Sequence, residues 1–92
     1  MEEKIHTKHP GGKQGVNISK AKYTAIRDAI LETLCTHQEI GFKELTQAVN
    51  DKLQGKFDGS IPWYVTTVKL DLEAHQTIKS VSSRGLQRLH LA

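Results

Sequence analysis

The feature that most limits what this chain can fold into is the stretch 60–75, which reads SIPWYVTTVKLDLEAH. At the helical period of about 100° per residue, its apolar residues fall on two opposite sides. One side is a stripe of aliphatic residues with helical spacing: Ile61, Val65, Val68 and Leu72. The opposite side carries Trp63, Leu70 and Ala74. A helix that is apolar on two sides needs cover on both. We therefore predict a central helix with one side in the core and the other under the N-terminal arm or a partner.

Helix-start signals precede this helix and two others. Ser60 is the predicted N-cap of the central helix, and Pro62 falls in its first turn, where a missing N–H costs nothing. Ser19 is the predicted N-cap of a helix from Lys20 to about Thr36. Gly41 takes the same position for a second helix that ends near residue 54. Three helices are therefore predicted, in that order along the chain.

The two ends of the chain have a different character. Residues 77–82 hold the apolar Ile78 and Val81, and residues 86–91 alternate between apolar and polar side chains. The turn signal Ser83-Arg84-Gly85 between them predicts a β-hairpin. Ile40 is predicted to lie in a very short strand. Residues 1–18 are predicted to form a partly flexible arm, because one proline and three glycines within residues 10–15 break both helix and strand.

Three helices followed by a hairpin are the order of a winged helix. The predicted fold is therefore α+β: a winged-helix domain over residues 19–92, preceded by the arm 1–18. Its second and third helices would form the helix-turn-helix, and the hairpin would be the wing. The stretch 72–78 resembles the wing entry of many bacterial winged-helix regulators. Gln76 stands where those proteins usually have glycine, so we expect a non-glycine residue in the left-handed turn there.

A closer resemblance covers most of the chain. It is carried by the Trp63-Tyr64 pair and the run Val-Lys-Leu-Asp-Leu-Glu-Ala at 68–74. Further matches are Pro10-Gly11, Lys13, Gly15, Tyr23, Ile30 and Phe57. These residues resemble a small family of uncharacterised bacterial proteins. The resemblance implies a small winged-helix-like domain and brings no activity or catalytic residue with it.

Composition and charge limit the class of protein. The 92 residues suffice for one domain, and no apolar run approaches the roughly 20 residues of a membrane span. The N-terminus lacks the apolar segment of a secretory signal, and the single cysteine, Cys35, suits a reducing cytoplasm. The net charge of +3 is uneven: residues 1–23 and 79–92 are each basic, whereas residues 24–78 are acidic. The basic ends suit either a polyanionic partner or simple solvation.

Catalytic and metal-site patterns are absent from the sequence. The five histidines do not form the close Cys and His sets of zinc sites. Cys35 lies beside the core stripe of the first helix and is predicted to be a buried apolar residue. Asp71 and Glu73, two apart on a helix, do not converge as a catalytic pair. Residues 11–15, GGKQG, lack the spacing of a phosphate loop. We therefore expect no enzyme, no metal and no cofactor.

Two functions from different classes remain, and DNA binding comes first by analogy with the fold. The candidate DNA-binding residues are Thr66, Thr67, Lys69, Lys79, Arg84 and Arg88, with Lys4, Lys8 and Lys13 on the arm. The alternative is a protein interface or homodimer contact through Trp63, Leu70 and Ala74. The central helix has one basic residue and no Arg, Asn or Gln for a bidentate base contact, which favours the alternative. Neither function involves a membrane.

Overall fold

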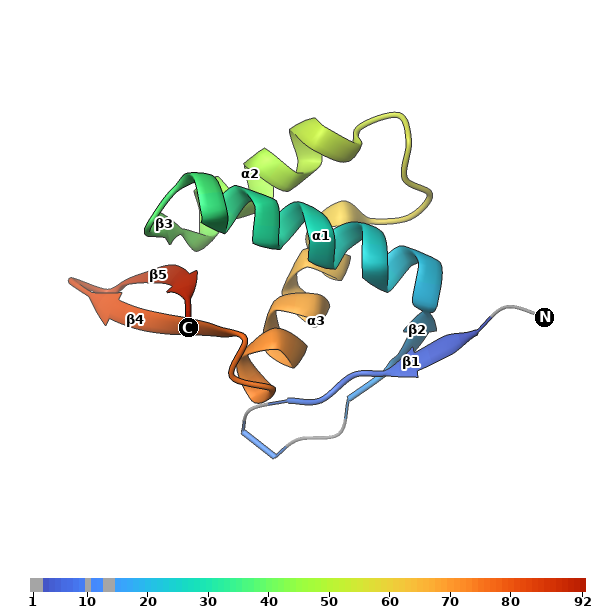
Figure 1. The fold of residues 1–92 in the computed structure, drawn as a ribbon, viewed down its shortest axis with the longest axis horizontal. Helices are drawn as coiled ribbons and strands as arrows, with labels where there is room; N and C mark the ends of the chain where they lie inside the picture. Colours follow the sequence, from blue (N-terminus) through green and yellow to red (C-terminus); the bar gives the residue numbers. More distant parts are fainter. Residues whose placement is uncertain (1–2, 10, 13–14) are drawn as a thin grey trace.

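Three helices and two small antiparallel sheets make up the computed structural model, which describes residues 3–9, 11–12 and 15–92 (Figure 1). The helices are α1 (Lys20–Thr36), α2 (Phe42–Leu53) and α3 (Ile61–Ala74). The strands are β1 (Lys4–His6), β2 (Asn17–Ser19), β3 (Ile40–Gly41), β4 (Ile78–Ser83) and β5 (Leu86–Leu91). The predicted α+β class is therefore confirmed, and each predicted helix lies within two residues of its predicted bounds.

The helix starts follow the predicted capping residues. The Ser19 side chain accepts a hydrogen bond from the Lys22 backbone N–H, and the Ser60 side chain accepts one from the Trp63 backbone N–H, each over 3.4 Å. Gly41 precedes α2 and offers no side-chain oxygen to its first turn. Each serine satisfies one of the backbone donors that the first turn of a helix leaves without a partner.

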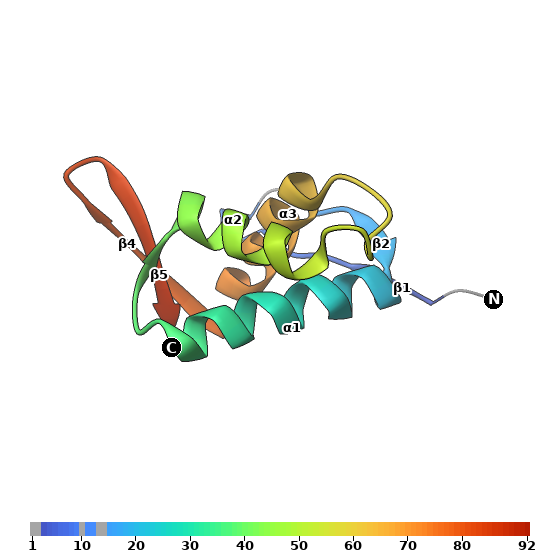
Figure 2. The same ribbon diagram turned by 90° about the horizontal axis from the view of Figure 1, so that it is seen from above.

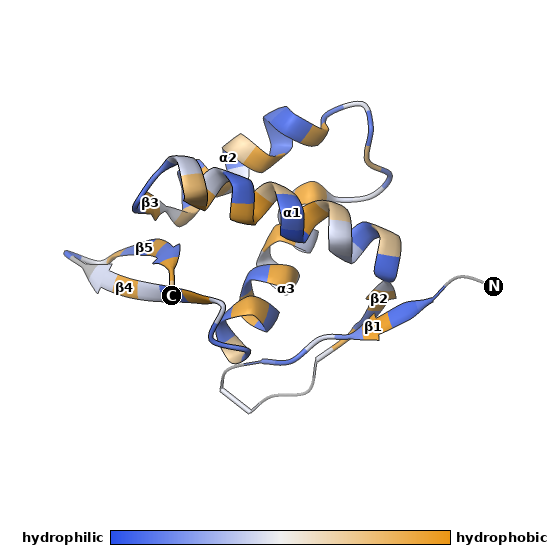
Figure 3. Cartoon of the chain, viewed as in Figure 1, coloured by the Kyte–Doolittle hydropathy of each residue, from blue (hydrophilic) through white to orange (hydrophobic). Residues whose placement is uncertain are grey.

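The core lies where the three helices meet. The aliphatic stripe of α3 is buried as predicted, and it faces buried residues of α1 and α2. The fully buried aliphatic side chains include Ile26, Ile30, Leu45, Val49, Val65 and Val68. In Figure 3, α3 is hydrophobic over most of its length, whereas the turn that follows it is hydrophilic. This stripe is the main hydrophobic contribution of α3 to stability.

The second sheet has the order β3-β5-β4, so β5 is its central strand. Ile40 pairs with Leu89, and Ile78 pairs with Leu91. The β4–β5 hairpin projects beyond the helices (Figure 2). It closes through Arg84 and Gly85, with φ of 53° and 78°, the left-handed pair of a type I′ turn.

The N-terminal segment corrects an expectation. Residues 1–18 were expected to form a partly flexible arm and no strand was assigned there, yet β1 and β2 pair antiparallel, with Ile5 opposite Ile18. Ile18 is buried and Ile5 packs partly against the core. In the sequence, positions 10–15 fall between β1 and β2 and belong to neither strand. The arm is thus tied to the start of α1.

The end of α3 contains the expected left-handed residue. Gln76 has a φ of 61°. Its N–H donates to the Glu73 carbonyl over 3.0 Å, and the Thr77 N–H donates to the Leu72 carbonyl over 2.9 Å. These two bonds form the Schellman motif that ends many helices. The chain then enters β4.

We expect Gln76→Gly to raise the free energy of unfolding by about 0.5–1 kcal/mol. The left-handed conformation costs a residue with a Cβ about 1–2 kcal/mol, and the greater entropy of unfolded glycine cancels part of the gain. Urea denaturation followed by circular dichroism measures the change. Gln76→Ala is the control, because alanine keeps the Cβ and should show no such gain. A destabilised glycine variant would contradict the argument.

Candidate functional site

The outward side of α3 is only partly covered. Trp63 is 47 % exposed, so the arm does not bury it. Thr66 is exposed, and its hydroxyl donates to the Pro62 carbonyl over 3.0 Å. Leu70 and Ala74 are half-buried. The predicted apolar outward side therefore exists, and Trp63 is its most exposed large apolar residue.

Trp63 is part of an aromatic cluster. Its ring meets that of Tyr64 edge to face, with centroids 4.9 Å apart and planes at 81°. Tyr64 meets Phe57 in the same way at 5.0 Å and 75°. The Lys22 ammonium lies 5.6 Å from the Tyr64 centroid and 6.0 Å from that of Phe57. We call Lys22, Phe57, Trp63 and Tyr64 the aromatic cluster; it joins α1, the loop before α3, and α3.

Lys69 was predicted to contact DNA from the outward side of α3, but it does not lie on that side, so the predicted exposure of Lys69 is wrong. It is 5 % exposed, with its ammonium 3.1 Å from Glu73 Oε1 and 4.9 Å from the Phe42 ring centroid. It also donates to Gln87 Oε1 over 3.4 Å. Position 69 lies about 80° around the helix from Ile61. That flank packs against the start of α2 and against β5, which removes Lys69 from solvent.

A second buried polar group was not predicted. Asp71 is 1 % exposed; one carboxylate oxygen accepts from the Lys8 backbone N–H over 2.8 Å, and the other accepts from the Tyr23 hydroxyl. The His75 Nδ1 lies 3.4 Å from the same carboxylate. Burial, and then the hydrogen bond to Asp71, raise the pKa of the Tyr23 phenol well above its usual value. Asp71 thus joins the arm, α1 and α3.

The remaining predicted DNA-binding residues that the structure describes are either exposed or half-buried. Lys79 and Arg84 are exposed on the hairpin, whereas Arg88 is half-buried and donates to Glu39 over 2.8 Å. Thr67 is half-buried on α3. On the arm, Lys4 and Lys8 are exposed. Lys13 and Pro10, which were also named from the sequence, lie outside the described residues.

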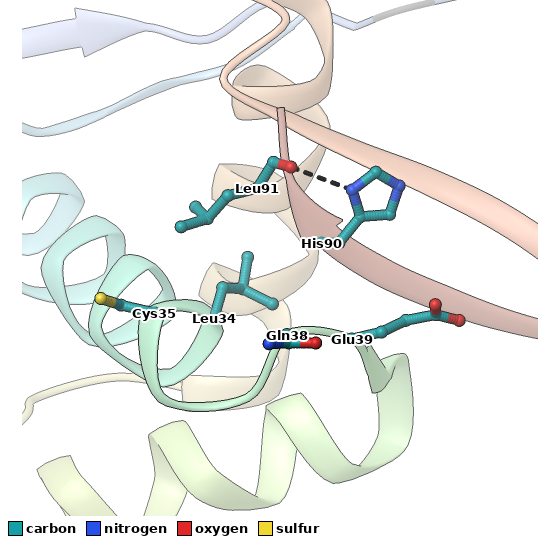
Figure 4. A pocket seen from close by; sticks show the side chains of 6 residues that line it. All are labelled: Leu34, Cys35, Gln38, Glu39, His90 and Leu91. Carbon is teal, nitrogen blue, oxygen red and sulfur yellow. Dashed lines mark hydrogen bonds between the residues drawn. The ribbon is translucent and has the colours of Figure 1, made fainter.

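Cys35 is exposed, so the prediction that it is buried is wrong. Leu34, the preceding residue, takes the core position at the end of α1. Cys35 lies at one side of an open pocket that α1, the following turn and β5 form, with Leu91 and His90 opposite (Figure 4). The described residues contain no group of three His, Cys, Asp or Glu side chains that could hold a metal ion. No helix among them is long and apolar enough to cross a membrane.

These features define a small α+β domain with a half-exposed aromatic helix face and an exposed basic hairpin. The chain matches a family of unknown function, DUF6958, over residues 4–89, and it belongs to that family. The expectation of an uncharacterised family is therefore confirmed. Neither the curated proteins nor the solved structures include a match to this chain.

Proposed function

We propose that the chain is a winged-helix domain whose function is to bind double-stranded DNA without catalysis. The element order α1-β3-α2-α3-β4-β5 and the sheet order β3-β5-β4 support the winged-helix assignment. In this arrangement α2 and α3 are the helix-turn-helix and the β4–β5 hairpin is the wing. Thr66 faces the ligand from the second turn of α3.

The charge distribution is the observation that carries this proposal. Most acidic side chains of the described residues take part in ion pairs. The basic side chains there without an acidic partner are Lys4, Lys8, Lys22, Lys43, Lys56, Lys79 and Arg84. The acidic ones without a basic partner are Glu44, Asp51 and Asp58. The charge left for an external partner is thus mainly positive, and it lies largely on elements around α3, which suits phosphates.

The hairpin supplies the clearest test of duplex binding. We expect affinity for a labelled duplex to fall steeply with salt, and the Lys79→Ala/Arg84→Ala double variant to bind more weakly to every sequence. For this variant, the plot of the logarithm of the binding constant against the logarithm of the salt concentration should have a slope that is shallower by about 2. Each phosphate contact contributes close to 1 to that slope. Lys52→Ala is the matched control, since Lys52 pairs with Glu32 on the α1–α2 side. A wild-type protein that binds no duplex at low salt would reject the proposal.

A second candidate function rests on the exposure of Trp63. A half-exposed tryptophan beside half-buried Leu70 and Ala74 resembles the centre of a protein interface, where Trp is a frequent anchor. Sedimentation of the wild type and of Trp63→Ala distinguishes a homodimer from a monomer. A monomeric wild type would count against self-association.

A further inference from the structure

Trp63 is held in place while part of its ring system stays open. In an edge-to-face pair, one ring presents its edge to the face of the other. Whichever role Trp63 takes with Tyr64, that contact covers at most one face of the indole. Tyr64 is in turn held by Phe57, and Trp63 is still 47 % exposed. The indole is thus a supported aromatic plane at the start of α3.

The surroundings of this plane favour negative charge. The Lys22 ammonium lies over the rings of Tyr64 and Phe57, next to Trp63 in the cluster, and no acidic residue lies in the first turn of α3. The N-terminal end of a helix carries a partial positive charge. Lys56 and Asp58, both exposed in the preceding loop, offset one another. A partner that is both planar and anionic fits this place better than an uncharged apolar protein surface does.

We infer that Trp63 stacks on an unpaired base of a nucleic-acid strand, while Lys22 and the start of α3 face its phosphates. The inference rests on the proposed nucleic-acid binding and adds the chemistry of the ligand at this end of α3. Bases within an intact duplex already stack on both faces, so the site selects single-stranded segments. Every base has a π-face, so little sequence preference is expected at this position.

The chain contains one tryptophan, so its fluorescence reports on Trp63 alone. The probes are a single-stranded homothymidine oligonucleotide and a duplex of equal length, both at low salt. We expect the single strand to quench Trp63 and to bind by fluorescence anisotropy of a labelled strand. Trp63→Ala should weaken single-strand binding about tenfold, the loss typical of one stacked base, and Trp63→Phe should recover much of it.

Leu86→Ala is the control variant, because Leu86 is 66 % exposed on the hairpin and lies outside the aromatic cluster. It should bind the single strand as the wild type does. Circular dichroism checks that each variant is folded. Single-strand binding that Trp63→Ala leaves unchanged, or that does not quench Trp63, would overturn the inference.

The outcomes for the two proposals are separable. Salt-dependent duplex binding without any effect at Trp63 would leave the proposed function standing and reject the stacking. Single-strand binding with quenching, but no duplex binding, would support the stacking and would reject only the duplex as the ligand of the proposed nucleic-acid binding. Binding of neither probe would reject both. A Trp63→Ala variant that binds both probes normally but sediments differently would assign Trp63 to a protein interface and reject the stacking.

Discussion

Asp71→Ala is expected to lower the free energy of unfolding by about 3 kcal/mol. The substitution leaves the Tyr23 hydroxyl and the Lys8 N–H without their acceptor, and Tyr23 is itself buried. Hydrogen bonds to a charged acceptor contribute about 1.5–3 kcal/mol each, so the loss exceeds that of an ordinary surface change. Urea denaturation measures it. Asp58→Ala, at an exposed position, should change stability by no more than about 0.5 kcal/mol.

Tyr23→Phe probes the same contact from the other side. In the unfolded chain the Tyr23 phenol has a pKa near 10, and in the folded chain the pKa is raised. The contact therefore contributes its full stability below about pH 10 and loses it as the pH rises further. The Tyr23→Phe variant has no phenol to ionise, so its free energy of unfolding should not show this decrease above about pH 10. The double variant Asp71→Ala/Tyr23→Phe completes the test. If its loss of unfolding free energy equals the sum of the two single losses, the two side chains do not interact directly.

The helices and the hairpin could be predicted because their signals are local. Serine caps, the apolar stripe of α3 and the Arg84-Gly85 turn each act within a few residues of one another. The left-handed Gln76 was placed by resemblance instead, because winged-helix regulators usually have glycine at that position.

The buried polar contacts could not be placed by the same means. Asp71 binds groups 48 and 63 residues away along the chain, and no local pattern encodes those distances. The sequence did hold a signal for Lys69: a charged residue on a largely apolar helix needs a partner when it is buried, and Glu73 lies one turn further along the helix. The β1–β2 pairing was missed because the effect of the breaking residues was taken to extend beyond positions 10–15 to the rest of the arm.

The buried pair of Lys69 and Glu73 gives the second large effect. Their side chains are 7 % and 13 % exposed, and Glu73 Oε1 makes no hydrogen bond although the Lys69 ammonium is 3.1 Å away. Glu73→Ala leaves that ammonium buried without a counter-charge, and we expect a loss of about 3 kcal/mol. Urea denaturation again measures it. Glu32→Ala, which breaks the exposed pair with Lys52, should cost less than about 1 kcal/mol.

The double variant Lys69→Met/Glu73→Leu shows whether the loss comes from the charge left behind. Methionine keeps an apolar stem against Phe42, and leucine fills the space of the carboxylate without needing a partner. Because the original pair is poorly hydrogen-bonded, replacing both charges is expected to restore stability to within about 1 kcal/mol of the wild type, or to exceed it. A double variant as unstable as Glu73→Ala would mean that the polar contacts to Gln87 and the hairpin, rather than charge burial, determine the stability of this junction.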